Sequence, residues 1–145
     1  MIISSKNTRL SVDILDYQYP YHKVSGESFD HDANWLMVQI GYSDDTVNEI
    51  YKDPCLLTTE VTWLIREIED VVTGKESLYI SDFLEPYLKI SLMRVDDTIM
   101  IGIVFVYDTS DGIWKERGVA ELMTLDRANE ILNELKSLSK RFPCR

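Results

Sequence analysis

The strongest constraint on the fold lies between residues 87 and 107, where two long strand-like stretches flank a two-residue acidic turn. Apolar side chains dominate 87–95 and 98–107, and only Asp96-Asp97 separates the two stretches. Two residues are too few for a crossover connection, so we expect an antiparallel hairpin. A parallel, doubly wound sheet would need strands that alternate with helices, and the predicted order of elements lacks that alternation.

Alternating or continuous apolar residues predict further strands on both sides of this hairpin. The predicted strands are 10–15, 35–42, 47–51, 78–80 and 113–123. Apolar residues occupy nearly every position of 35–42, which predicts a central strand covered on both faces. The dipeptide Asp53-Pro54 is expected to break the chain after 47–51.

Two segments, 58–73 and 125–142, carry apolar residues at helical spacing. Thr58 or Thr59 is expected to cap the first helix, and Thr124 the second. The predicted fold is therefore α+β, with a curved, mostly antiparallel sheet of about six or seven strands packed by two amphipathic helices.

The length of 145 residues predicts a single domain over 1–145. The longest apolar run, 99–107, has nine residues and is too short for a membrane helix, and the N-terminus lacks a signal-peptide pattern. A soluble, cytoplasmic protein is expected. In that compartment Cys55 and Cys144 are expected to be reduced thiols.

The net charge of -10 is unevenly distributed along the chain. Residues 27–60 carry eight acids against one base, whereas 115–145 carry seven bases against five acids. The negative electrostatic field of these acids opposes binding to nucleic-acid phosphates and to acidic membranes, and it favours a basic protein partner. Solubility alone is the simpler explanation of the same charge.

No pattern of catalytic, metal-ligating or cofactor-binding residues stands out in the sequence. Asp30-His31-Asp32 offers too few ligands for a metal site, and no glycine-rich loop precedes a helix. We therefore expect no enzyme activity, no cofactor and no metal. Trp35 and Trp63 are expected in the core, whereas Trp114, which follows an acidic loop, could contact a partner.

Three short stretches, 30–36, 54–60 and 83–86, share an ordered set of residues with a known family. The residues that carry the likeness are Asp30, Asp32, Asn34, Trp35, Cys55, Leu56, Glu60, Phe83, Glu85 and Pro86. With them the chain resembles the WapI-type immunity proteins of bacterial polymorphic toxin systems, which include contact-dependent growth inhibition.

The resemblance implies a cytoplasmic antitoxin that binds and neutralises the C-terminal domain of a cognate toxin. In the founding system that toxin is a nuclease that acts on tRNA. The motif residues stand at the starts of predicted strands and helices, where helix capping and turn formation are the simpler roles. We therefore expect them to be structural.

Turn carboxylates are the natural contacts for a basic toxin, because they can reach a cationic groove without disturbing the core. The predicted toxin-binding residues are Asp44, Asp45, Glu49, Asp53, Asp96, Asp97, Asp108, Asp111 and Trp114. Binding would occlude the active site or the substrate groove of the toxin.

Two other functions remain open at the level of sequence. The first is a small-molecule binding protein or minor enzyme that uses the 17–31 loop, with His22 or His31 as the titrating group. The second is a structural subunit that has no toxin partner. The oligomeric state also remains open.

Overall fold

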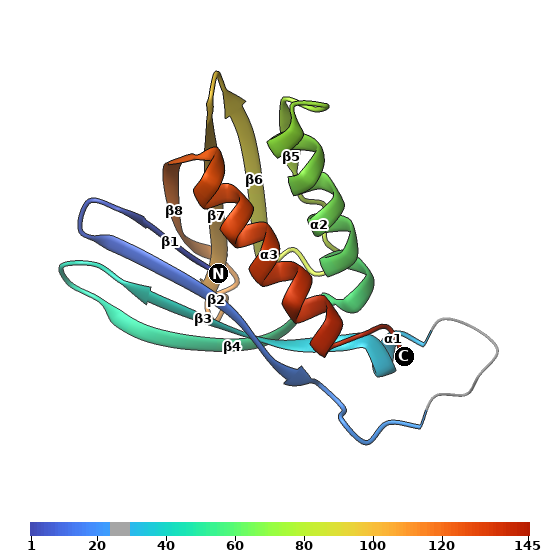
Figure 1. The fold of residues 1–145 in the computed structure, drawn as a ribbon. Helices are drawn as coiled ribbons and strands as arrows, with labels where there is room; N and C mark the ends of the chain where they lie inside the picture. Colours follow the sequence, from blue (N-terminus) through green and yellow to red (C-terminus); the bar gives the residue numbers. More distant parts are fainter. Residues whose placement is uncertain (24–29) are drawn as a thin grey trace.

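Two four-stranded antiparallel sheets form most of the molecule (Figure 1). The computed structural model describes residues 1–23 and 30–145. Sheet A contains β1 (Ile2–Ser5), β2 (Thr8–Tyr17), β3 (Trp35–Ser43) and β4 (Asn48–Leu57). Sheet B contains β5 (Leu78–Ile80), β6 (Leu88–Val95), β7 (Thr98–Asp108) and β8 (Lys115–Thr124). The helices are α1 (His31–Asn34), α2 (Thr58–Thr73) and α3 (Leu125–Arg141).

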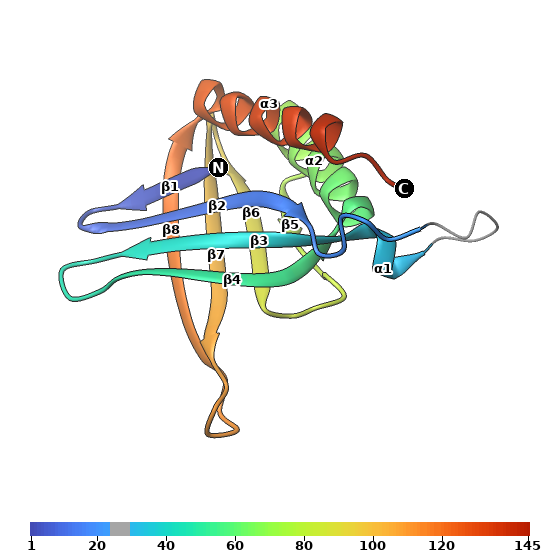
Figure 2. The same cartoon turned by 90° about the horizontal axis from the view of Figure 1, so that it is seen from below.

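The predicted α+β class and both amphipathic helices are confirmed. The strands are divided between two sheets, and they include β1, which has no counterpart among the predicted strands. Figure 2 shows the strands of sheet A crossing in front of sheet B, with α2 and α3 toward the top of the view. No helix within residues 1–23 and 30–145 is long and apolar enough to cross a membrane.

The core lies between the two sheets and the two long helices. One hydrophobic cluster joins Leu36 of β3, Leu64 of α2, Phe105 of β7 and Leu135 of α3. Period-2 alternation aims one side of each strand into this cluster, and the helical period does the same for α2 and α3. On β3 the central position is confirmed, although only one face is fully buried while the other is half-buried.

Local signals set the helix ends described here, although one of the predicted caps is wrong. Gly74 ends α2 with a left-handed φ of 79°, and the Thr124 hydroxyl caps α3 by accepting from Arg127 N at 3.3 Å. The prediction that Thr58 or Thr59 caps α2 is wrong. Leu57 occupies the cap position, and the Glu60 carboxylate accepts from its N–H at 2.8 Å.

The prediction that Asp53-Pro54 breaks the chain is also wrong, because β4 continues through it to Leu57. The register against β3 shifts between Leu36 and Val38, so the strand bulges at Pro54. β4 is also an edge strand. A proline at a bulge or on an edge removes no hydrogen bond that the sheet requires.

Candidate functional site

The three motif stretches, far apart in the sequence, meet at the start of α2. The Thr58 hydroxyl donates to Asn34 Oδ1 at 2.8 Å, which joins α1 to α2. Glu60 Oε1 accepts from Leu84 N at 2.6 Å, which joins α2 to the 83–86 loop. Glu60 is almost fully buried, and its two oxygens are divided between the helix start and this loop.

Asn34 is the most completely bonded polar side chain of this junction, and it has no exposed surface. Its Nδ2 donates to the main-chain oxygens of Asp30 and Arg145, both at 2.8 Å. Its Oδ1 accepts from Thr58 Oγ1 at 2.8 Å and from Arg145 N at 2.9 Å. One side chain therefore connects α1, α2 and the segment after α3.

Arg145 strengthens the same junction through its own side chain. The guanidinium donates to the main-chain oxygens of Tyr19, Pro20 and Ala33, and it lies 3.6 Å from the ring centroid of Tyr17. These contacts are invisible to sequence patterns, because 111 residues separate Asn34 from Arg145.

An Asn34→Ala variant is expected to lose about 2 to 3 kcal/mol of unfolding free energy, because it leaves buried donors and acceptors on Thr58 and Arg145 unsatisfied. Urea unfolding followed by circular dichroism would measure the loss. Asn129→Ala, at an exposed position of α3, is the matched control and should change stability by less than about 0.5 kcal/mol. Equal stability of the two variants would contradict the structural role proposed for Asn34.

A hollow of about 400 Å³ opens beside this junction. Its lining, which we call the motif pocket, consists of His31, Leu57, Thr59, Glu60, Trp63, Asp82 and Leu84. Trp63 is 56% exposed, so its predicted place in the core is wrong. The helical period places Trp63 next to the apolar stripe of α2, and only the packed structure shows that more than half of its surface stays exposed.

The remaining motif residues differ in burial. Cys55, Leu56 and Phe83 are buried, whereas Glu85 is partly exposed. Trp35, predicted in the core, is only half-buried. Burial raises the pKa of the Cys55 thiol to about 12, with a further contribution from the charge of Asp53. Cys55 is thus held as an unreactive thiol at neutral pH. Asp32 and Pro86 are exposed.

Six of the predicted toxin-binding carboxylates lie at three separate corners of the molecule, and Glu49 and Asp53 lie on β4. Asp44 and Asp45 occupy the β3–β4 turn, Asp96 and Asp97 the β6–β7 turn, and Asp108 and Asp111 the β7–β8 loop. The last two turns stand at opposite ends of β7 (Figure 2). We therefore expect a partner surface of ordinary size to contact one or two of these corners and not all three.

Within the β3–β4 turn, the Asp44 carboxylate accepts hydrogen bonds from residues of the turn itself. Asp44 accepts hydrogen bonds from the N–H groups of Thr46 and Val47 at 2.7 and 2.8 Å and from the Tyr42 hydroxyl at 3.0 Å. The bonds from Thr46 are the main cause that lowers the pKa of Asp44 to about 2. Asp45 accepts from Asn7 at 3.1 Å. Asp44 thus forms the turn, and only Asp45 presents an exposed carboxylate there.

The β7–β8 loop lies next to β4 and brings several predicted residues together. Asp53, Tyr87 and Asp108 line a hollow of about 330 Å³, and Trp114 stacks on Tyr87 at 5.4 Å between ring centroids. Burial, followed by the charge of Glu85, raises the pKa of Asp53. We call this surface the acidic end; its residues are Asp53, Glu85, Tyr87, Asp108, Asp111 and Trp114.

Lysine and arginine side chains of this protein form ion pairs with several acids near the acidic end. Lys115 Nζ lies 2.8 Å from Asp108 and 2.9 Å from Asp111, and the bond from Lys115 is the main cause that lowers the pKa of Asp108. Glu49 lies 3.6 Å from Arg117 and accepts from the Tyr51 hydroxyl. Within the described residues, no hydrogen bond or ion pair engages the Asp53 carboxylate.

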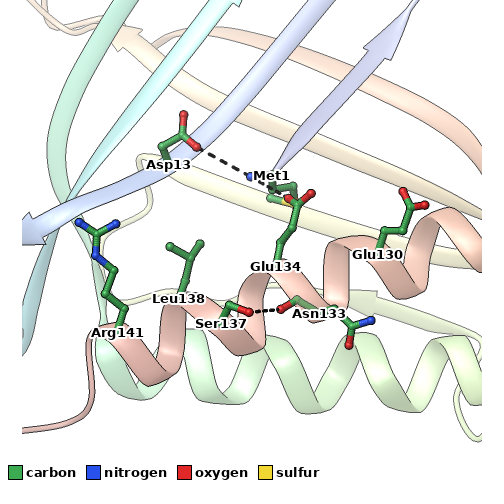
Figure 3. Close-up of a pocket in the computed structure, with 8 residues that line it drawn as sticks. All are labelled: Met1, Asp13, Glu130, Asn133, Glu134, Ser137, Leu138 and Arg141. Carbon is green, nitrogen blue, oxygen red and sulfur yellow. Dashed lines mark hydrogen bonds and ion pairs between the residues drawn. The ribbon is translucent and has the colours of Figure 1, made fainter.

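Sequence patterns missed a further acidic groove between β2 and α3. Figure 3 shows Asp13, Glu130 and Glu134 around it, together with Arg141, in a hollow of about 730 Å³. The Met1 amino group lies 3.3 Å from Glu134 and 3.9 Å from Asp13. The spacing of Glu130 and Glu134, one helical turn apart on the exposed side of α3, is the signal that could have indicated it.

The alternative site in the 17–31 loop falls partly on 24–29, which lie outside the described residues. His22 Nε2 lies 2.9 Å from Asp30 Oδ2, and this hydrogen bond is the main cause that lowers the pKa of Asp30. Asp30 also caps α1 by accepting from Ala33 N at 3.3 Å. In the described part of the chain, no group of three His, Cys, Asp or Glu side chains could hold a metal ion.

Comparisons with known proteins give one family and two solved structures of low similarity. A family model described as the Immunity protein WapI-like family matches residues 1–143. WHY3 from Arabidopsis thaliana has a TM-score of 0.45 and 10% identity over 98% of this chain and 86% of that one. WHY1 from Arabidopsis thaliana has a TM-score of 0.45 and 11% identity over 98% of this chain and 88% of that one. No curated protein matches.

Proposed function

Since the chain belongs to the WapI-like family of immunity proteins, we propose that it binds a cognate toxin domain and occludes that domain's active site or substrate groove. Binding of a toxin is what the immunity role requires. Occlusion needs a rigid surface of the right charge and shape and no catalytic group. The protein is accordingly proposed to act without enzyme activity, cofactor or nucleic-acid contact, in the cytoplasm and away from membranes.

The stacked pair Tyr87–Trp114 beside the unpaired carboxylate of Asp53 is the observation that carries this proposal. Trp114 is half exposed, yet Tyr87 holds its ring in a nearly parallel stack with an interplanar angle of 12°. An exposed aromatic that is already ordered loses little entropy on binding, and such residues dominate interface energetics. We therefore place the centre of the toxin contact at the acidic end.

The charge of the chain supports a basic partner. The net charge of -10 creates a field that speeds the approach of a cationic protein and repels phosphate backbones. A nuclease groove that binds a phosphate backbone is cationic, so a basic nuclease such as a tRNase fits the acidic end. In this proposal Asp53 and Glu85 face the cationic groove, and Trp114 packs beside them at the centre of the contact.

Co-expression with a candidate toxin C-terminal domain from the same genome tests the proposal. Cells that carry both genes should grow, whereas cells that carry the toxin domain alone should not. The purified pair should associate faster at low salt than at high salt, because steering between exposed charges is screened by ions.

Two results would contradict the proposal in different ways. Growth arrest despite a folded, co-expressed immunity protein would reject that toxin as the partner. Full protection with an association rate that does not depend on salt would keep the immunity role and reject the acidic surface.

A further inference from the structure

Strand β7 is apolar on both of its faces, although only one face packs in the core. Ile99, Ile101, Ile103 and Phe105 point into the hydrophobic cluster and are almost fully buried. The alternate positions, which face away from the core, are Met100, Gly102, Val104 and Val106. Antiparallel sheets with one solvated face normally alternate apolar with polar residues, and strands apolar on both faces belong to sheets covered on both sides.

The apolar character extends across all four strands of sheet B. Leu78, Met93, Met100 and Leu122 are paired in register from β5 to β8 and form one continuous row. The next row consists of Ile80, Ser91, Gly102 and Ala120. The exposed fractions are 55% for Leu78, 58% for Ile80, 45% for Met93 and 55% for Leu122. We call this outward surface of β5 to β8 the outer face.

Sheet A shows how an ordinary solvated face of this protein looks. One of its outward rows, Asp13, Gln39 and Lys52, is paired in register and entirely polar. The next row, Ile2, Ser11, Gly41 and Ile50, carries large apolar side chains only on the two edge strands. Sheet B differs in having an outward row, Leu78, Met93, Met100 and Leu122, to which every strand contributes a large apolar side chain. A contiguous exposed apolar surface of this kind marks an interaction site.

We propose that the outer face is the interface of a symmetric dimer in which a second copy of this chain covers it. Its charges favour a second copy over a basic partner. Between the Val95–Thr98 row and the Val106–Glu116 pair it carries only Lys89 and Glu116, one cation and one anion. A basic domain would find no excess of acids there, whereas two copies of an otherwise acidic chain can meet there without placing carboxylates against carboxylates in the contact.

The placement of the two charges also suits a two-fold axis. Lys89 lies on β6 and Glu116 on β8, on opposite sides of β7 and one row apart. In face-to-face packing about an axis parallel to β7, β6 of one copy lies over β8 of the other. Lys89 of each copy then approaches Glu116 of the other, so the contact is self-complementary as two-fold symmetry requires.

The size of the outer face is compatible with a stable dimer. Four strands about 4.8 Å apart and four outward rows about 6.8 Å apart outline roughly 500 Å². Side chains that stand out from a sheet expose more area than the outline, which brings the surface close to the roughly 600 to 1,000 Å² that each partner buries in a specific interface. Two aligned sheets also pack face to face readily.

Light scattering on the size-separated full chain, without toxin, tests the dimer. We expect a mass of twice 16.9 kDa at micromolar concentration. Met93→Lys with Leu122→Lys should raise the dimer dissociation constant by roughly 100-fold or more, because both lysines would lose water in the interface. Ile50→Lys, at a 66% exposed apolar position on sheet A, is the matched control and should remain dimeric.

Exchanging the charges of Lys89 and Glu116 tests the proposed two-fold axis separately. Lys89→Glu should weaken the dimer, and Lys89→Glu combined with Glu116→Lys should restore it. Circular dichroism and melting temperature would establish that each variant is folded. A monomeric wild type, a folded double-lysine variant that stays dimeric, or failure of the combined exchange to restore what the single change weakened would overturn the proposal. A monomeric wild type whose double-lysine variant is folded but no longer binds toxin would assign the outer face to the toxin instead.

Discussion

Cells that express an Asp53→Lys, Trp114→Ala variant are expected to lose protection against the cognate toxin. Loss of the stacked indole removes the ordered aromatic of the acidic end, and the new lysine places a cation opposite a cationic groove. Truncation of a central aromatic commonly costs about 2 kcal/mol or more, which is roughly a 30-fold weaker complex, and the reversed charge adds to this. Surface plasmon resonance at two salt concentrations, paired with a growth assay, measures both effects.

Two further variants localise the effect. Glu76→Lys makes the same change of charge at an exposed position after α2, and it should leave protection intact. Asp97→Lys alters the opposite end of β7 and should also leave protection intact if the toxin contacts the acidic end. If Asp97→Lys abolishes protection while the Asp53→Lys, Trp114→Ala variant remains active, the contact lies at the β6–β7 turn.

Leu64→Ala and Leu135→Ala are each expected to lower the free energy of unfolding by about 2 to 5 kcal/mol. Leu64 on α2 and Leu135 on α3 are 1% and 5% exposed, and both belong to the cluster between the helices and the sheets. Each substitution removes buried apolar surface and leaves a cavity, and the two sheets limit how far the site can collapse. Urea unfolding measured by fluorescence gives the change.

Leu15→Ala is the control for these two variants. Leu15 lies on β2 and is 36% exposed, so its truncation should cost far less than either core change. Losses below about 0.5 kcal/mol for both Leu64→Ala and Leu135→Ala would show that the helix faces are wrongly assigned.

Local sequence signals were sufficient for the elements that depend on near neighbours. The helical period over 58–73 and 125–142, the Thr124 cap and the Asp96-Asp97 turn all involve residues within a few positions of one another. The turn has a left-handed φ of 51° at Asp96, a conformation that Asp adopts more readily than most residues. Interactions between such close neighbours can be predicted from the sequence alone.

Only the tertiary structure decided which distant residues meet. The amino-acid sequence does not predict that Asn34 bonds to Arg145 or that β4 bulges at Pro54 where it pairs with β3. It also does not predict that Trp63 stays 56% exposed. Sequence patterns also indicate the carboxylates of three turns together as toxin contacts, although the structure places these turns at three separate corners. Contacts between residues more than a hundred positions apart depend on how the two sheets and two helices pack around one core. Helical period and capping depend only on neighbouring residues, so they can be predicted from the sequence.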